Sequence, residues 1–116
     1  MLFQDFVEDE VLSPVLISDA LRTTKAEIAG TLGLGPDVLS RASRLRERKT
    51  QVRLRQLLEV LHRVEAETGS LITAYAWFRA EPLQGFGGAT PALLLRHGKA
   101  NQVHAYLDRI MAGGYV

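Results

Sequence analysis

Few residues in this chain have the types and spacing that catalysis or metal binding requires. The three histidines are His62, His97 and His104, and none is followed by a second histidine at the helical His-X3-His spacing or joined by nearby carboxylates. The sequence therefore predicts no metal site. The chain has no cysteine, so disulfides and thiolate metal sites are excluded, as is common for proteins of a reducing cytosol.

Nucleotide-binding and hydrolytic motifs are also missing. The run Gly85-Phe86-Gly87-Gly88 follows no predicted strand and lacks the spacing of a dinucleotide fingerprint. Nothing in the sequence gathers a Ser, a His and an Asp into a triad. Glu65 and Glu67 are two residues apart and so lie on different faces of a helix. We therefore expect a protein that binds partners, not an enzyme, and we expect no cofactor.

Charge is distributed unevenly along the 116 residues, although the net charge is only +1. Residues 41–63 hold eight Lys and Arg side chains against two Glu, whereas the first ten residues hold four acidic side chains and no basic one. A basic centre on a nearly neutral protein indicates a local patch for an anionic partner.

The elements that would position these residues are helices. Apolar residues recur at helical spacing, and we read no segment as a strand. Residues 1–14 are predicted to be an acidic arm or short helix, and residues 81–89 a Gly-rich loop. The helices are expected over about 15–24, 24–33, 36–45, 50–68, 70–79, 90–97 and 101–112, the last with Val103, Leu107 and Ile110 inward. The fold class is all-α.

The predicted organisation is an arm over residues 1–14, a helix-turn-helix-like unit over 15–69 and a small helical domain over 70–116. The N-terminus lacks the basic start and apolar run of a secretory signal. No stretch approaches the roughly 20 apolar residues that span a bilayer. We therefore expect a cytoplasmic protein with no membrane partner.

A helix-turn-helix motif is suggested by Ala29, Gly33 and Leu39, which stand at relative positions 0, 4 and 10. This spacing suits a small residue at the helix crossing, a permissive residue in the turn and an apolar residue in the second helix. It resembles the Xre/Cro class of repressors. The outward residues of the second helix would include Ser40, Arg41 and Arg44, which become the candidate DNA-binding residues.

Three interpretations of this motif stay open. The arginines could read operator DNA, Arg41 being best suited to a bidentate contact with guanine. The motif could be a degenerate one that binds DNA weakly or not at all. It could also be a packing unit of three helices whose arginines form a solvated face. The basic run favours the first interpretation, whereas Asp37 at the start of the helix disfavours it.

The C-terminal half carries the more specific pattern. It reads Trp77-Phe78, then Pro82 and the Gly-rich loop, then a helix start at Thr90-Pro91-Ala92-Leu93-Leu94-Leu95, then His97-Gly98, and finally Gly113-Gly114-Tyr115-Val116. In this order the pattern resembles the toxin-binding domain of the Xre/MbcA/ParS antitoxins, which are partners of RES-domain toxins. The resemblance spans about residues 25–116 and is weak before that.

The resemblance implies a specific mechanism. In that family many members are dimeric, and the C-terminal segment enters the NAD-binding cleft of a toxin that degrades NAD or transfers ADP-ribose. Here Gly113, Gly114, Tyr115 and Val116 would form this plug, with the final carboxylate on Val116. Trp77, Phe78, Pro91, Leu94 and Gly98 would frame the domain that presents it. The loop 83–89 departs from some members of the family, which puts contacts there in doubt.

Elementary chemistry is compatible with a plug. Two glycines allow close approach of the backbone to a partner, and Tyr115 offers an aromatic anchor with a polar tip. A carboxylate could mimic a dinucleotide phosphate on arginines of the partner. The segment could equally be a frayed tail, as most C-termini are. The alternative for the whole protein is a stand-alone Xre-like transcriptional regulator whose C-terminal half only dimerises.

Overall fold

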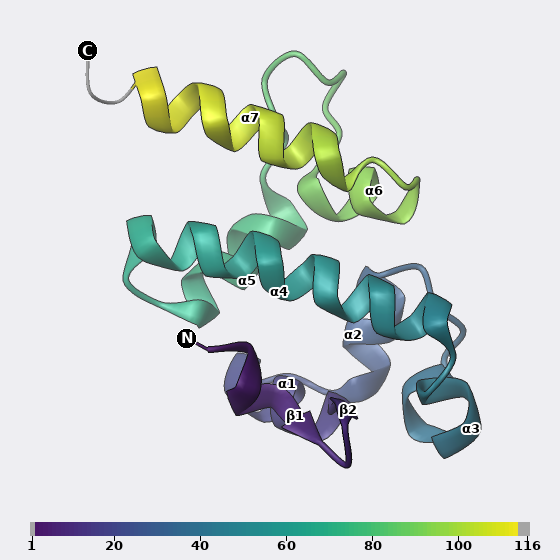
Figure 1. Cartoon of the computed structure of the whole chain (residues 1–116). Coiled ribbons are helices and arrows are strands. Elements are labelled where there is room, and N and C mark those ends of the chain that lie inside the picture. The colour runs from purple at the N-terminus through teal and green to yellow at the C-terminus, as the bar shows by residue number, and fades with distance from the viewer. Residues whose placement is uncertain (1, 114–116) are drawn as a thin grey trace.

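The computed structural model describes residues 2–113, and within them the chain is mostly helical, which confirms the all-α prediction. Seven α-helices follow a short N-terminal hairpin, as Figure 1 shows. Their bounds are α1 Pro14–Leu21, α2 Lys25–Thr31, α3 Ala42–Leu45, α4 Arg48–Thr68, α5 Leu71–Ala80, α6 Pro91–Arg96 and α7 Ala100–Gly113.

The prediction that the chain has no strand is wrong for the N-terminal segment. A 3-10 helix (Phe3–Phe6) leads into an antiparallel hairpin of β1 (Val7–Glu8) and β2 (Val11–Leu12). The outer edge of β2 is closed by Gln51 of α4, whose side-chain amide accepts from the Leu12 N–H (2.9 Å) and donates to the Leu12 carbonyl (3.2 Å). This side chain thus takes the place of a third strand. Gln51 and Leu12 are 39 positions apart, so the pattern of neighbouring residues could not predict this contact.

Helix starts follow the expected capping chemistry. The hydroxyl of Thr24 accepts from the Glu27 amide at the start of α2, and the hydroxyl of Thr90 accepts from the Leu93 amide at the start of α6. Ser13 and Ser70 cap α1 and α5 in the same way. A side-chain oxygen here satisfies an amide that has no partner within the helix, so these boundaries were predictable from short stretches of sequence.

The predicted third helix over 36–45 is not continuous, and this corrects the predicted bounds of that helix. A three-residue 3-10 helix, Val38–Ser40, is separated from α3 by Arg41, whose backbone is extended (φ −108°, ψ 121°). Val38 and Leu39 are buried, but Ala42, three residues after Leu39, is exposed and Leu45 is only half-buried. Beyond Leu39 no buried face holds the next turn, and short helices are not stable without such packing.

Helix α4 is the centre of the fold. Its apolar residues at helical spacing, Leu54, Leu57, Leu58, Leu61 and Val64, are all buried. One cluster of buried side chains runs from Phe6 in the N-terminal segment to Leu107 in α7 and includes this stripe. Both predicted helical units therefore share one core, and their division at residue 70 stays a prediction. No helix among residues 2–113 is long and apolar enough to cross a membrane.

Candidate functional site

An open apolar groove lies where the C-terminal halves of α4 and α7 meet α5. In Figure 1 these two helices run in the same direction, so that both end on one side of the molecule. The groove has a volume of about 320 Å³ and is lined by Val64, Glu67, Thr68, Trp77, Leu107, Ile110 and Met111. Apolar side chains thus form most of its wall within the described part of the chain.

Ile110 departs from the sequence-based prediction. We expected it to point inward with Val103 and Leu107, and those two are buried, but the Ile110 side chain is 46% exposed. The prediction for Ile110 is therefore wrong. Ile110 stands on the open wall of the groove with Val64, Thr68 and Trp77, where no other element among residues 2–113 covers it. An exposed large apolar residue beside a groove is typical of a contact surface.

Arg63 of α4 fixes the position of α7. Its guanidinium donates to the Asp108 carboxylate (2.6 Å) and to the His104 carbonyl (3.3 Å), and it lies 3.1 Å from His104 Nδ1. A further contact reaches the Met111 sulfur at 3.7 Å. One planar group thus holds almost two turns of α7 through several donors, for which an arginine is well suited. Of the histidines, His104 is the one that takes part in this contact.

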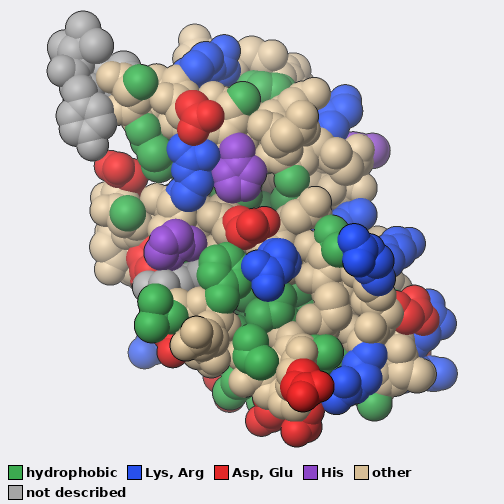
Figure 2. Space-filling model, in the orientation of Figure 1, with side chains coloured by type: hydrophobic (Ala, Val, Ile, Leu, Met, Phe, Trp, Pro, Cys, Tyr) green, Lys and Arg blue, Asp and Glu red, His purple; other side chains and the backbone are tan. Residues whose placement is uncertain are grey.

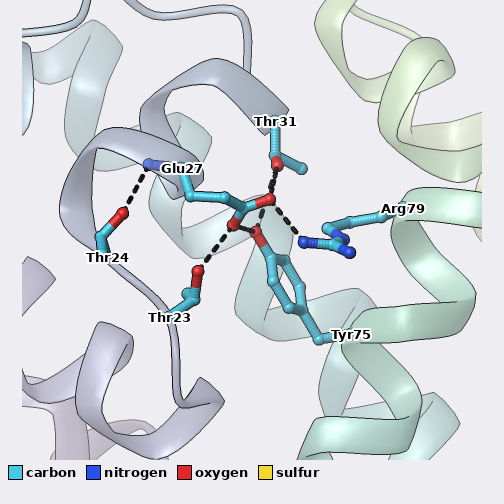
Figure 3. Close-up of polar contacts among 6 residues, drawn as sticks. All are labelled: Thr23, Thr24, Glu27, Thr31, Tyr75 and Arg79. Atoms are coloured by element: carbon cyan, nitrogen blue, oxygen red, sulfur yellow. Dashed lines mark hydrogen bonds and ion pairs between the residues drawn. The ribbon is translucent and has the colours of Figure 1, made fainter.

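A second polar cluster, shown in Figure 3, fixes α5 to α2. The Glu27 carboxylate accepts from the hydroxyls of Thr23 (3.1 Å), Thr31 (3.0 Å) and Tyr75 (2.5 Å), and from the Arg79 guanidinium (2.6 Å). We call these five residues the Glu27 cluster. Because Trp77 lies between Tyr75 and Arg79 on α5, the cluster also determines where one wall of the groove stands.

Ionisation within the Glu27 cluster follows from these contacts. Burial by itself would raise the pKa of Glu27, but the hydrogen bonds from Tyr75, Thr31, Arg79 and Thr23 outweigh burial, and the pKa is lowered. Burial, followed by the hydrogen bond to Glu27, raises the pKa of the Tyr75 hydroxyl. Glu27 is therefore held as a carboxylate and Tyr75 as a neutral donor, which is a structural arrangement and not a poised acid–base pair.

The candidate DNA-binding residues lie together on the surface but not on one helix. Ser40 ends the 3-10 helix, Arg41 is the extended residue after it, and Arg44 lies in α3; all three are exposed. In Figure 2, Lys and Arg side chains gather at the lower right, over α3 and the start of α4, beside the acidic side chains at the lower edge.

Much of this basic surface already contacts the protein itself. Arg41 lies 3.7 Å from the Asp37 carboxylate, and Arg44 lies 3.3 Å from that of Glu47. Other basic side chains reach the Asp9 carbonyl (Arg46), the Leu32 carbonyl (Arg53) and the ring of Phe3 (Arg55). Exposed ion pairs are weak and exchange readily, so Arg41 and Arg44 stay accessible, whereas Arg53 has a structural contact at 2.8 Å.

The predicted plug lies at the edge of the described chain. Gly113 is the last residue of α7, two positions after Met111 in the groove wall. Gly114, Tyr115 and Val116 lie outside the described residues. Among residues 2–113, no group of three His, Cys, Asp or Glu side chains is placed to hold a metal ion.

Comparison with known families identifies the C-terminal part of the chain. Residues 68–113 match the antitoxin Xre/MbcA/ParS C-terminal toxin-binding domain. The match covers 46 of the 116 residues and confirms the resemblance read from the sequence for this segment. No curated protein and no solved structure matches the chain. The N-terminal resemblance to Xre-type repressors and the RES-domain partner both stay predictions.

The segment that matches the toxin-binding domain contains most of the groove. Thr68, Trp77, Leu107, Ile110 and Met111 belong to the matched segment, whereas Val64 and Glu67 precede it on α4. The groove could not be predicted from the sequence because three helices build it. A signal was present in the apolar side chains at 107, 110 and 111, which share one helical face. That face continues to the end of α7 without a covering partner among residues 2–113.

Proposed function

We propose that this chain is an antitoxin of a toxin–antitoxin pair and that it neutralises a RES-domain toxin by occupying its NAD-binding cleft. The segment Gly113–Val116 enters the cleft, and the helical domain before it supplies the supporting contacts. Inhibition is steric, so the chain itself carries out no chemistry. The antitoxin acts in the cytoplasm as a homodimer within the toxin complex.

The observation that carries this proposal is the family match over residues 68–113, whose domain is described as toxin-binding. Three features of the described chain support it. Helix α7 leads directly to the predicted plug, the apolar groove beside its end offers a contact surface, and the bonds from Arg63 hold α7 in place. A rigid helix that presents a short segment lowers the entropic cost of binding that segment.

The decisive experiment combines co-purification with an assay of NAD consumption. The full chain is expressed with the RES-domain protein encoded beside it, and the complex is compared with one in which Gly113–Val116 are deleted. We expect the full chain to form a complex without NAD consumption and the truncated chain to release the activity. The control is Val15→Ser, which removes an exposed apolar side chain from α1, far from α7, and should still neutralise.

Helicity measured by circular dichroism should be the same for the full and the truncated chain, since Gly113 is the last residue of α7. A truncated chain that still silences the toxin contradicts the plug mechanism. If no complex forms with any RES-domain protein, the antitoxin assignment itself fails. Light scattering on the complex tests the homodimer separately.

A second role, operator binding with autoregulation, is favoured by one set of positions. Ala29 and Leu39 are buried and Gly33 has a φ of +71°, as the helix-turn-helix spacing requires. Ser40, Arg41 and Arg44 would face the DNA. The interruption at Arg41 shortens the element that would enter the major groove, so we expect phosphate contacts to dominate over base reading.

Gel-shift titration with the upstream DNA of the operon tests this role. Arg41→Ala with Arg44→Ala should weaken binding and make it less dependent on salt, whereas Lys99→Ala, an exposed change in the toxin-binding domain, should not. Unchanged binding in the double variant means that these residues are not used. Strong operator binding in a chain with no toxin partner would favour the alternative, a stand-alone regulator.

A further inference from the structure

The N-terminal hairpin and the start of α4 form one exposed face that combines apolar and charged side chains. An open hollow of about 250 Å³ lies between them, and its lining includes Val7 and Glu10 of the hairpin and Arg48, Val52 and Arg55 of α4. Val7 is 44% exposed and Val52 is 40% exposed. Large apolar side chains that stay open around one hollow are typical of a contact surface.

Charges of both signs surround these apolar side chains. The hairpin carries Glu8, Asp9 and Glu10, and α4 begins with Arg48. None of these four side chains forms an ion pair within residues 2–113. In Figure 2, acidic side chains lie at the lower edge beside the basic side chains over the start of α4. The face therefore has an acidic part and a basic part, and both keep their charge for a partner.

The acidic turn of the hairpin is held in a fixed and strained shape. Asp9 and Glu10 join β1 to β2 as a two-residue turn, and both have positive φ (51° and 70°). The Arg46 guanidinium donates to the Asp9 carbonyl (3.1 Å). Such turns prefer Asn followed by Gly, and a left-handed backbone is unfavourable for a glutamate. Strained residues of this kind cluster at functional sites, which indicates that the charge of Glu10 has a use outside the fold.

A face with these two parts is complementary to a second copy of itself. Two identical chains related by a twofold axis present the same surface to each other, so the acidic part of each copy meets the basic part of the other. Apolar side chains in the middle with charges around them are the usual arrangement of a protein interface. A nucleic acid fits this face less well, because the acidic turn repels its phosphates.

We propose that two copies of this chain associate through this face, with Glu10 of each copy beside Arg48 of the other and with Val7 and Val52 of both copies between these pairs. The inference rests on the homodimer of the proposed function and identifies where its two copies meet. The hairpin and α7 contact α4 on opposite sides, as Figure 1 shows. The dimer therefore leaves the groove beside α7 open for the toxin.

Charge reversal on either side of the proposed contact provides the test, with the full chain and without toxin. Association of Glu10→Arg and of Arg48→Glu is measured by analytical ultracentrifugation, for each variant alone and for an equal mixture of the two. Alone, each variant places like charges at both contacts of the twofold interface, so we expect its dissociation constant to rise by about tenfold or more. In the mixture every contact joins opposite charges again, and heterodimers should form with nearly the affinity of the wild type.

Two controls carry the same changes of charge at exposed positions elsewhere. Glu81→Arg lies after α5 and Lys99→Glu lies before α7, and both should dimerise as the wild type does. A further variant, Asp9→Asn with Glu10→Gly, supplies the residues that the turn prefers. It should stabilise the fold and yet weaken the dimer, a combination that a purely structural role of the turn does not produce. Circular dichroism on each variant shows whether the fold is retained.

The proposal is overturned if the wild type stays monomeric at every concentration, or if it dimerises and neither charge reversal weakens the dimer. The second outcome means that the two copies meet through another face. Variants that stay monomeric even in the mixture also overturn it, because their defect then has another cause than the pairing of these charges. No toxin is present in these measurements, and light scattering on the toxin complex tests its homodimer separately, so the two proposals can fail independently.

Discussion

At the residue scale, the carboxylate of Glu27 accepts hydrogen bonds from four side chains that belong to α2, to the turn before it and to α5. Two of these partners, Tyr75 and Arg79, lie 48 and 52 positions away along the chain. A charged acceptor with several donors contributes more than an ordinary hydrogen bond, because its negative charge strengthens each one. The cluster therefore connects the N-terminal helices to the segment that matches the toxin-binding domain.

We predict that Glu27→Gln lowers the free energy of unfolding near neutral pH by about 1–3 kcal/mol, because the charge that these donors stabilise is lost. The folded-state pKa of Glu27 lies below its ordinary value of 4.5. Its contribution to stability is thus present above that value and is lost as the pH falls through the folded-state pKa. Urea titrations at several pH values should show the gap between wild type and variant closing in acid.

Glu59→Gln is the control for this measurement, since Glu59 is exposed on α4. It should leave stability nearly unchanged at each pH. A constant gap between wild type and Glu27→Gln down to strongly acid pH would contradict a role for the ionised carboxylate.

At the scale of the elements, the turn after α2 sets how that helix meets the C-terminal part of the chain. Gly33 has a φ of +71°, and a Cβ at this position would lie 2.8 Å from Cγ of Arg96 in α6. Gly30, three residues earlier in α2, has no such neighbour within 4 Å. The same substitution at these two glycines therefore has opposite consequences.

We predict that Gly33→Ala destabilises the protein by about 1–2 kcal/mol, because alanine is strained in the left-handed region. Gly30→Ala should stabilise it by about 0.5–1 kcal/mol, because alanine restricts the unfolded chain and favours the helix. Thermal or urea unfolding of the two variants measures both. Equal effects of the same sign would mean that the turn after α2 does not need its glycine.

At the scale of the whole molecule, one core joins the hairpin, the N-terminal helices and the C-terminal helices α5–α7. Buried residues from Phe6 to Leu107 form a single cluster around α4. When two units share a core of this kind, unfolding of one exposes buried side chains of the other. The described chain should therefore unfold in one step in spite of its two predicted units.

We predict that unfolding followed by Trp77 fluorescence, which reports on the C-terminal helices, coincides with unfolding followed by helicity, which reports on all helices. Coincident midpoints and slopes are the expected result for a two-state transition. A separate, earlier fluorescence transition would show that residues 70–116 open independently of the rest.

Features that depend on neighbours within about four residues could be read from the sequence. The stripe of α4 from Leu54 to Val64, the caps at Thr24 and Thr90 and the helix stop at Gly69 are of this kind. Each rests on helical periodicity or on a single side chain bonding to a nearby amide. The pattern from Trp77 onward also sufficed to point to the toxin-binding family.

Features that depend on contacts between residues far apart in the sequence could not be predicted in this way. The hairpin needs Gln51 to complete its edge, 39 positions from Leu12. The interruption at Arg41 arises because nothing packs on the turn after Leu39. Ile110 is periodic with Leu107 and yet exposed, because it stands on the open wall of a groove that three helices build and that no other described element covers.

The sequence alone thus determined the helical class, most helix limits and the resemblance of the C-terminal segment to the toxin-binding domain. Only the tertiary structure decided which apolar residues are buried and where the Glu27 cluster and the groove form. It also decided which basic side chains contact other groups of the protein. The physical reason is that helix formation depends on contacts within a turn or two, whereas burial depends on residues that meet only after long loops have closed.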